Sequence, residues 1–185
     1  MNEEIKKKAA EKMDHAVDSL KKDYATIRTG RASVALLDNV MVDAYGAIQK
    51  LSQTATLSTP DPRTIVIQPW DPKLIASIEK AIMKADLGLT PVNDGKLVRI
   101  NVPQLTEERR KEFVKVAKKR SEEGKVAVRN IRRETNDRLK KLEKDKEMSE
   151  DDLKKDLDEI QKMTDSYIKK MDDILEHKSA EIMEV

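Results

Sequence analysis

The sequence predicts an α+β protein in which a small α+β domain is inserted into an elongated three-helix bundle. The two ends of the chain, residues 1–30 and 105–185, carry apolar residues at steps of three and four, which is the repeat of an amphipathic helix. Residues 31–104 instead hold all six prolines and short clusters of β-branched residues. A composition of 39% charged and 3% aromatic residues also favours a helical body with a large solvated surface.

The first helix is predicted over residues 1–30. Gly30 is expected to end it, because glycine adopts the left-handed conformation that terminates helices at little cost. Arg28 and Arg31 flank this end, where they either stay solvated beside the helix dipole or contact a polyanion. The apolar stripe of this helix comprises Ile5, Ala9, Met13, Ala16, Leu20, Tyr24 and Ile27.

The inserted domain, residues 31–104, is predicted to combine one helix with a small sheet or a pair of sheets. The helix should begin after Asp71 as N-cap, with Pro72 at its first position, and end near Gly88. A turn is expected at residues 60–62. The predicted strands, where β-branched residues cluster, are residues 40–44, 55–58, 64–68 and 98–102.

The chain crosses between the two predicted domains twice, and we expect the two short crossings to form a hinge. A rigid corner without functional motion is the alternative. The predicted hinge residues are Gly30, Arg31, Ala32 and Ser33 in the first crossing, and Val102, Pro103, Gln104 and Leu105 in the second.

The longest predicted helix spans residues 106–146, with Thr106 as its N-cap, and would be about 60 Å long. Its seam includes Gly124, which costs about 1 kcal/mol relative to alanine in a helix, so we expect close approach of a neighbouring helix there. The seam consists of Phe113, Ala117, Ser121, Gly124, Val128, Ile131, Thr135, Leu139 and Leu142.

A last helix is predicted after Ser149, an N-cap that is followed by the acidic residues 150–152. None of the three helices can bury its apolar stripe alone, so together they predict a three-helix bundle. The stripe of the last helix comprises Leu153, Leu157, Ile160, Thr164, Tyr167, Met171 and Ile174.

One flank of the longest helix is basic. Residues 106–146 hold 16 basic and 9 acidic residues, a net charge of +7, whereas residues 147–185 hold 6 and 13, a net charge of −7. Arg129 and Arg133 lie one turn apart with Arg132 beside them, so three guanidiniums can converge on adjacent phosphates. We call this flank the basic stripe; it comprises Lys111, Lys115, Lys118, Lys125, Arg129, Arg132, Arg133 and Lys140.

The basic stripe predicts binding to the phosphate backbone of RNA, with an affinity that falls as salt rises. Because few aromatic residues are present to stack on bases, we expect recognition of the shape of a folded RNA. The alternative is that the acidic last helix lies against the stripe and neutralises it.

No enzymatic site is predicted. The chain has no cysteine, which excludes a disulfide, a thiolate zinc site and a cysteine nucleophile, and its two histidines are isolated. Gly95-Lys96 lacks the first glycine and the hydroxyl residue of a phosphate loop. We therefore expect no catalytic residue, metal or cofactor. No apolar run is long enough for a signal peptide or membrane span, so a cytoplasmic location is expected. The protein is also expected to be a monomer.

Four stretches of the sequence closely resemble the bacterial ribosome recycling factor family, and the similarity extends along the whole chain. They are RTGRAS at residues 28–33, DLGL at 86–89, LTEERRK at 105–111 and VAVRNIRRE at 126–134. Two positions depart from the family pattern: Val34 replaces a frequent proline, and Gln104 replaces the second proline of a Pro-Pro-Leu exit. The resemblance implies an L-shaped, two-domain layout.

The resemblance also implies a function in translation after termination. Members of the family bind the large (50S) subunit of the 70S ribosome through 23S ribosomal RNA. With elongation factor G and GTP they split the ribosome, which releases mRNA and tRNA, while the small domain swings about the hinge. By resemblance, Arg132 is the principal RNA contact. The full set of candidate RNA-binding residues is Arg132, Arg129, Arg133, Arg28, Arg31, Lys125, Lys118 and Arg110.

Two other functions remain compatible with the composition alone. A general RNA chaperone would bind many structured RNAs and need no elongation factor. A structural coiled-coil adaptor would bind protein and show little dependence on salt.

Overall fold

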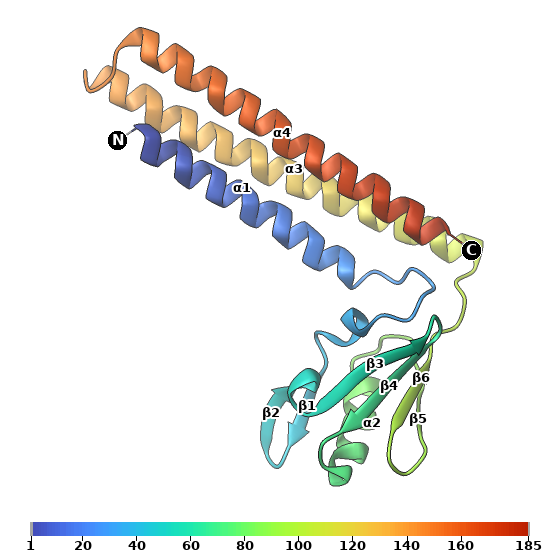
Figure 1. The fold of residues 1–185 in the computed structure, drawn as a ribbon. Helices are drawn as coiled ribbons and strands as arrows, with labels where there is room; N and C mark the ends of the chain where they lie inside the picture. Colours follow the sequence, from blue (N-terminus) through green and yellow to red (C-terminus); the bar gives the residue numbers. More distant parts are fainter. Residues whose placement is uncertain (1, 185) are drawn as a thin grey trace. The chain divides into compact units, whose positions relative to one another are not determined.

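The computed structural model describes residues 2–184, so the two terminal residues of the predicted bundle, 1 and 185, lie outside it. The chain forms three long helices, α1 (Asn2–Ala25), α3 (Glu107–Lys144) and α4 (Glu150–Met183), and a smaller region of strands and helix (Figure 1). The chain divides into two compact units. The first comprises Met1–Tyr24 with Val114–Glu181, and the second Ala25–Phe113 with Ile182–Val185.

The first unit is a three-helix bundle whose core consists of the predicted apolar stripes. Helix α3 buries its seam at Ala117, Val128 and Leu139, each fully inaccessible to solvent. Helix α4 buries Ile160 and Met171 in the same way. The prediction for α1 was wrong at one position, because Val17 is buried where Ala16 was expected and Ala16 is only half-buried. The larger side chain fills the core at this turn of the helix.

Both predicted helix caps are present in the structure. The Thr106 hydroxyl accepts a hydrogen bond from the Arg109 backbone N–H at 3.2 Å, and the Ser149 hydroxyl accepts one from the Asp152 N–H at 3.1 Å. Each cap satisfies a backbone donor that the first turn of a helix leaves unpaired. The predicted start of each long helix therefore agrees with the structure to within one residue.

The end of α1 differs from the prediction. The helix stops at Ala25, and Gly30 takes its positive φ of 81° five residues later, in the connection to the second unit. Beyond Ala25, Ile27 is buried, and the Arg28 guanidinium donates to the Pro103 carbonyl oxygen at 3.2 Å. These contacts replace the additional helical turn that the apolar spacing predicted.

The second unit contains two antiparallel sheets and helix α2 (Ile75–Lys84). Strands β1 (Met41–Ala44) and β2 (Ala47–Lys50) form one sheet. The other has the order β3-β4-β6-β5, with β3 (Ala55–Asp61), β4 (Thr64–Pro69), β5 (Pro91–Asn93) and β6 (Val98–Asn101). Short 3₁₀ turns lie at η1 (Val34–Leu37), η2 (Leu51–Gln53) and η3 (Pro72–Leu74).

Four of these six strands were predicted, whereas β2 and β5 were missed. Strand β2 has no buried residue that would mark an apolar face, and β5 is three residues long and begins with a proline. The predicted turn at residues 60–62 was displaced, because Pro60 and Asp61 belong to β3 and the chain turns at Pro62 and Arg63.

The core of the second unit lies between the four-stranded sheet and α2. Alternate residues of the central strands point into it, namely Ile65 and Ile67 from β4 and Val98 and Ile100 from β6. Helix α2 contributes three isoleucines, Ile75, Ile78 and Ile82. Asp71 caps this segment as predicted, accepting from the Lys73 N–H at 3.0 Å, although its first turn is the 3₁₀ turn η3.

Gly124 lies at a close contact between α3 and α4. A Cβ atom at this position would lie 3.2 Å from the Met171 sulfur and 3.3 Å from its terminal methyl carbon. Met171 is completely buried, so little space is available for it to move. The predicted reason for a glycine in the seam therefore agrees with the structure.

A cluster of charged residues joins the beginning of α1 to α4. The Lys6 ammonium donates to Asp156 at 3.0 Å and to Glu159 at 2.7 Å, and the Asn2 amide donates to Asp156 at 3.0 Å. Burial of Asp156 by itself raises the pKa of its carboxyl group, but the hydrogen bonds from Asn2 and Lys6 outweigh it and hold the pKa below the usual 3.8. The ionised form of Asp156 therefore stabilises the bundle.

We expect Gly124→Leu to lower the free energy of unfolding by about 1–3 kcal/mol, because the new side chain would overlap Met171 in a filled core. Ala127→Leu, at an exposed position of the same helix, is the matched control and should change stability by less than about 0.5 kcal/mol. Urea unfolding followed by circular dichroism measures both. Equal stability of the two variants would show that the helices do not approach closely at Gly124.

Asp156→Asn should destabilise the protein by about 1–3 kcal/mol near neutral pH, because Lys6 loses a buried anionic partner. Because the folded-state pKa of Asp156 lies below 3.8, the carboxylate of the unfolded chain takes up a proton first as pH falls. The stabilisation is therefore present above pH 3.8 and is lost as pH falls through the folded-state pKa. Urea unfolding at about pH 7 and about pH 3 should therefore show the variant's deficit shrinking in acid.

Asp158→Asn is the control for this experiment. Its carboxylate is exposed and pairs with Lys162 one turn along α4 at 2.8 Å, an arrangement that contributes little to stability. A deficit of Asp156→Asn that is equal at both pH values would contradict a role for the ionised carboxylate.

Candidate nucleic-acid interface

The basic stripe lies on the side of α3 that borders α4. Five of its members, Lys118, Lys125, Arg129, Arg132 and Arg133, follow one another along the first unit. Lys118 and Arg133 are exposed, Arg129 and Arg132 are half-buried, and only 15% of the Lys125 side chain is exposed. Side-chain exposure within the basic stripe is therefore lowest at the edge that contacts α4 and highest on the side that faces solvent.

Two members of the stripe hold α3 against α4. The Lys125 ammonium forms an ion pair with Asp172, and an Arg132 N–H donates to the Gln161 side-chain oxygen at 3.1 Å. The Gln161 amide in turn donates to Asp165 at 2.8 Å. The acidic helix thus pairs directly with Lys125, while Arg132 meets a neutral amide and keeps its charge available.

The other three of these five members, Lys118, Arg129 and Arg133, are unpaired or weakly paired in the described part of the chain. Arg129 contacts Glu122 on its own helix at 3.1 Å, a partly exposed pair that a phosphate can replace at little cost. Within residues 2–184, the side chains of Lys118 and Arg133 make no ion pair. Arg129, Arg132 and Arg133 therefore present three guanidiniums over one turn of helix, which is the geometry that binds neighbouring phosphates.

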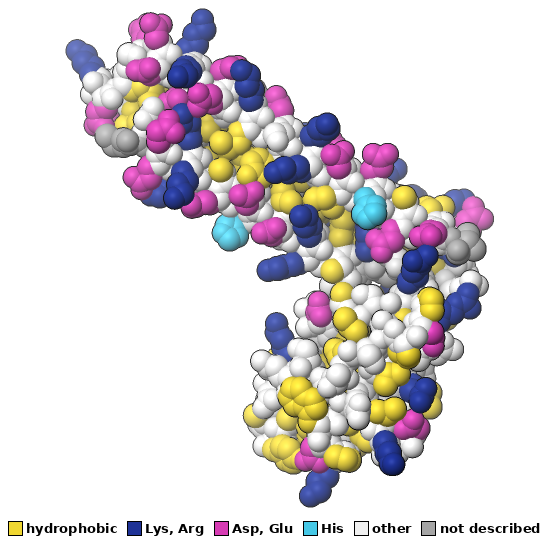
Figure 2. Space-filling view, viewed as in Figure 1, with side chains coloured by type: hydrophobic (Ala, Val, Ile, Leu, Met, Phe, Trp, Pro, Cys, Tyr) yellow, Lys and Arg dark blue, Asp and Glu magenta, His cyan; other side chains and the backbone are white. Residues whose placement is uncertain are grey.

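Figure 2 gives a broader view of the charge on one face of the molecule. Acidic and basic side chains alternate over the visible part of the bundle, while the visible face of the second unit carries more apolar and uncharged side chains. Net charge alone therefore does not mark a binding surface. The local arrangement along α3 is what distinguishes the basic stripe.

The other three predicted RNA-binding residues belong to the second unit. Arg28 is half-buried and its guanidinium donates to the Pro103 carbonyl oxygen; burial, with Arg109 nearby, lowers its pKa. Arg31 forms an ion pair with Glu184 at 2.9 Å. Arg110 is only 9% exposed, and its Nε atom has no hydrogen-bond partner within residues 2–184. These three arginines therefore belong to a different compact unit from the five residues of the basic stripe described above.

The predicted hinge residues differ in how firmly they are held. The Ala32 N–H donates to the Pro62 carbonyl and the Val102 N–H to the Arg63 carbonyl, both at 2.7 Å. The Ser33 hydroxyl caps η1 by accepting from the Ala35 N–H at 3.3 Å. Three of the predicted hinge residues are therefore part of the fold of the second unit.

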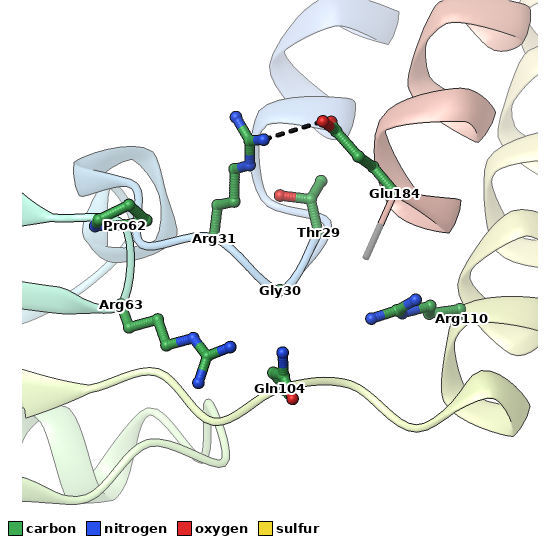
Figure 3. A pocket seen from close by; sticks show the side chains of 8 residues that line it. All are labelled: Thr29, Gly30, Arg31, Pro62, Arg63, Gln104, Arg110 and Glu184. Carbon is green, nitrogen blue, oxygen red and sulfur yellow. Dashed lines mark hydrogen bonds and ion pairs between the residues drawn. The ribbon is translucent and has the colours of Figure 1, made fainter.

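A pocket in the second unit contains a residue that the sequence did not suggest. Arg63 lines it together with Arg31, Gln104, Arg110 and Glu184 (Figure 3). Arg63 lies in the turn between β3 and β4, where the sequence shows only the prolines of a turn. Nothing in the spacing of the arginines along the chain shows that the fold brings them to one pocket.

The described residues offer neither a metal centre nor a membrane-spanning helix. Within residues 2–184 there is no group of three or more histidine, aspartate or glutamate side chains placed to bind a metal. No helix in the same range is both long and apolar enough to pass through a lipid bilayer.

Comparison with known proteins identifies the relatives of this chain. The family model described as ribosome recycling factor matches residues 20–183. A ribosome-recycling factor from Geotalea daltonii is 62% identical over 173 residues, which cover 94% of each chain, and one from Trichlorobacter lovleyi is 61% identical over the same extent.

Solved structures agree with this assignment. The solution structure of a ribosome recycling factor matches with a TM-score of 0.80 and 42% identity, covering 100% of this chain and 98% of the other. Models of the T. thermophilus ribosome recycling factor, bound with E. coli elongation factor G to the E. coli post-termination complex, match with a TM-score of 0.68 and 47% identity over all of both chains. The chain belongs to the ribosome recycling factor family.

Proposed function

We propose that this chain recycles ribosomes after termination: it binds the large subunit of the post-termination complex and, with elongation factor G and GTP, splits the ribosome to release mRNA and tRNA. The observation that carries this proposal is the 62% identity with a ribosome-recycling factor over 94% of both chains. It is supported by a structural relative that is described together with elongation factor G on the post-termination complex. We further propose that it works in the cytoplasm as a monomer; like the family to which it belongs, it is not an enzyme.

The basic stripe is proposed as the contact with 23S ribosomal RNA. Arg129, Arg132 and Arg133 form its centre, because they lie within about one turn of α3 and none is neutralised by α4. Lys118 extends this surface along the helix, and Lys125 contributes from its edge while it pairs with Asp172. Release of counterions from the RNA backbone supplies much of the affinity of such a surface.

Arg28, Arg31 and Arg110 are proposed as secondary RNA contacts. Their present partners limit them to different degrees. Arg28 is anchored by Pro103, while Arg31 can exchange an exposed ion pair with Glu184 for a phosphate. Arg110 keeps a buried, unpaired Nε atom.

We propose that the two functional domains, residues 1–30 with 105–185 and residues 31–104, move about the crossings between them. The hydrogen bonds of Ala32, Ser33 and Val102 concentrate this motion at Gly30-Arg31 and at Pro103-Gln104, with Leu105 buried at the far end of the second crossing. Elongation factor G supplies the energy of the movement through GTP hydrolysis, because it is the nucleotide-hydrolysing partner in this reaction.

The test of the RNA surface compares ribosome splitting by the native protein with that by an Arg129→Ala, Arg132→Ala, Arg133→Ala variant. Splitting of post-termination ribosomes is followed by light scattering with elongation factor G and GTP. We expect the variant to bind the large subunit at least about tenfold more weakly, and the dependence of log affinity on log salt to become shallower, because up to three phosphate contacts are lost.

Two single variants control for effects on folding and on net charge. Gln161→Ala removes the hydrogen bond to Arg132 but leaves the arginine, and Arg138→Ala removes an exposed cation from the other flank of α3. Both should split ribosomes like the native protein. If the triple variant also does so, the basic stripe is a solvated surface; if the native protein does not split ribosomes, the proposed function is wrong.

The hinge is tested with two glycines of similar backbone conformation. Gly30 has a φ of 81° and Gly95 a φ of 95°, so alanine at either position is strained by about 1–2 kcal/mol. We expect Gly30→Ala to slow splitting severalfold and Gly95→Ala, in a turn that ends before β6, to leave it unchanged at similar stability. Equal splitting rates for both variants would argue against a hinge at Gly30.

A further inference from the structure

A pocket in the second unit gathers three arginines whose charge is only partly neutralised. Arg31, Arg63 and Arg110 line a cavity of about 290 Å³. They come from three segments of the chain: the connection after α1, the turn between β3 and β4, and the first turn of α3 (Figure 3). One carboxylate, that of Glu184, lines the same cavity, so the four charged side chains carry a net charge of +2.

The carboxylate is already engaged by one of the three arginines. An Arg31 N–H donates to a Glu184 oxygen at 2.9 Å. Figure 3 shows this pair at one side of the pocket, whereas Arg63 and Arg110 extend toward each other from opposite sides, with Gln104 between them. Within residues 2–184, the guanidiniums of Arg63 and Arg110 form no ion pair, although the carboxylate of Glu107, on the same turn of α3, interacts electrostatically with Arg110.

Arg110 is the group that most needs a partner. It is only 9% exposed, and its Nε–H is buried without an acceptor in the described part of the chain. A guanidinium that has lost its hydration is costly unless an anion compensates for it. Arg63, by contrast, is exposed to solvent, so an anion can reach it directly.

We propose that Arg63 and Arg110 bind one phosphate group in this pocket, with the side-chain amide of Gln104 as a further donor. The planar fork of a guanidinium matches two phosphate oxygens, and two such forks on opposite sides enclose the group. Phosphate is either a free anion or part of an RNA backbone. Only the RNA source rests on the proposed function, since a free anion requires no ribosome.

The test measures binding of inorganic phosphate to the isolated protein by titration calorimetry and thermal unfolding, at a constant ionic strength of about 0.15 M. We expect saturable binding that raises Tm, which chloride does not reproduce. Arg63→Gln and Arg110→Gln should each weaken binding by about tenfold or more. Arg99→Gln, which removes an exposed arginine paired with Asp94 on β6, is the control and should bind like the native protein.

Further arms of the experiment identify the source and guard against misfolding. If a short single-stranded RNA competes with phosphate, and if Arg63→Gln weakens the binding of that RNA, the ligand is the RNA backbone. If phosphate binds without such competition, the ligand is a free anion. Arg110→Lys, which keeps the charge, should recover part of the binding if Arg110→Gln fails to fold. Absence of saturable binding, or binding unchanged in Arg63→Gln, overturns the proposal. Because ribosome splitting is measured separately, a failure of phosphate binding would not count against the proposed function.

Discussion

Burial of the seam of α3 is the constraint on which the rest of the structure depends. A helix of 38 residues with one narrow apolar face is not stable alone, so it requires two partner helices over most of its length. The partners come from opposite ends of the chain, which makes the bundle a structure of long-range contacts. Residues at the seam are accordingly small or apolar, and Gly124 leaves room for Met171, whose sulfur would lie only 3.2 Å from a Cβ atom at this position.

Charge is arranged around this apolar core according to what each position must do. Lys6 and Asp156 join α1 to α4 through a nearly buried pair, and Lys125 joins α3 to α4 through Asp172. Arg132 instead donates a hydrogen bond to the neutral amide of Gln161, so its contact with α4 does not neutralise its charge. The opposite net charges of α3 and α4 thus assist assembly at a few points and leave cations of the stripe available to a ligand.

The sequence was sufficient for the bundle because periodicity and caps depend on neighbours along the chain. Thr106, Ser149 and Asp71 act as caps in the structure, and the apolar steps of three and four identify the buried faces. Features that depend on tertiary contacts were missed. Gly30 does not end α1, because contacts of Ile27 and Arg28 end it earlier. Strand β5 is stabilised by its pairing with β6, which the short sequence of β5 does not reveal. Arg63 and Arg110 line the same pocket because the fold brings distant segments together.

The hydrogen bonds of Ala32 and Val102 have a consequence for how such a molecule can arise. Their acceptors, the carbonyls of Pro62 and Arg63, are neighbours in one turn, so the two ends of the segment of residues 31–104 lie at almost the same point. A segment with adjacent ends can be inserted into an existing helical hairpin at the level of the gene without pulling its host apart. The same adjacency makes the segment a candidate for exchange between homologues as a self-contained evolutionary module.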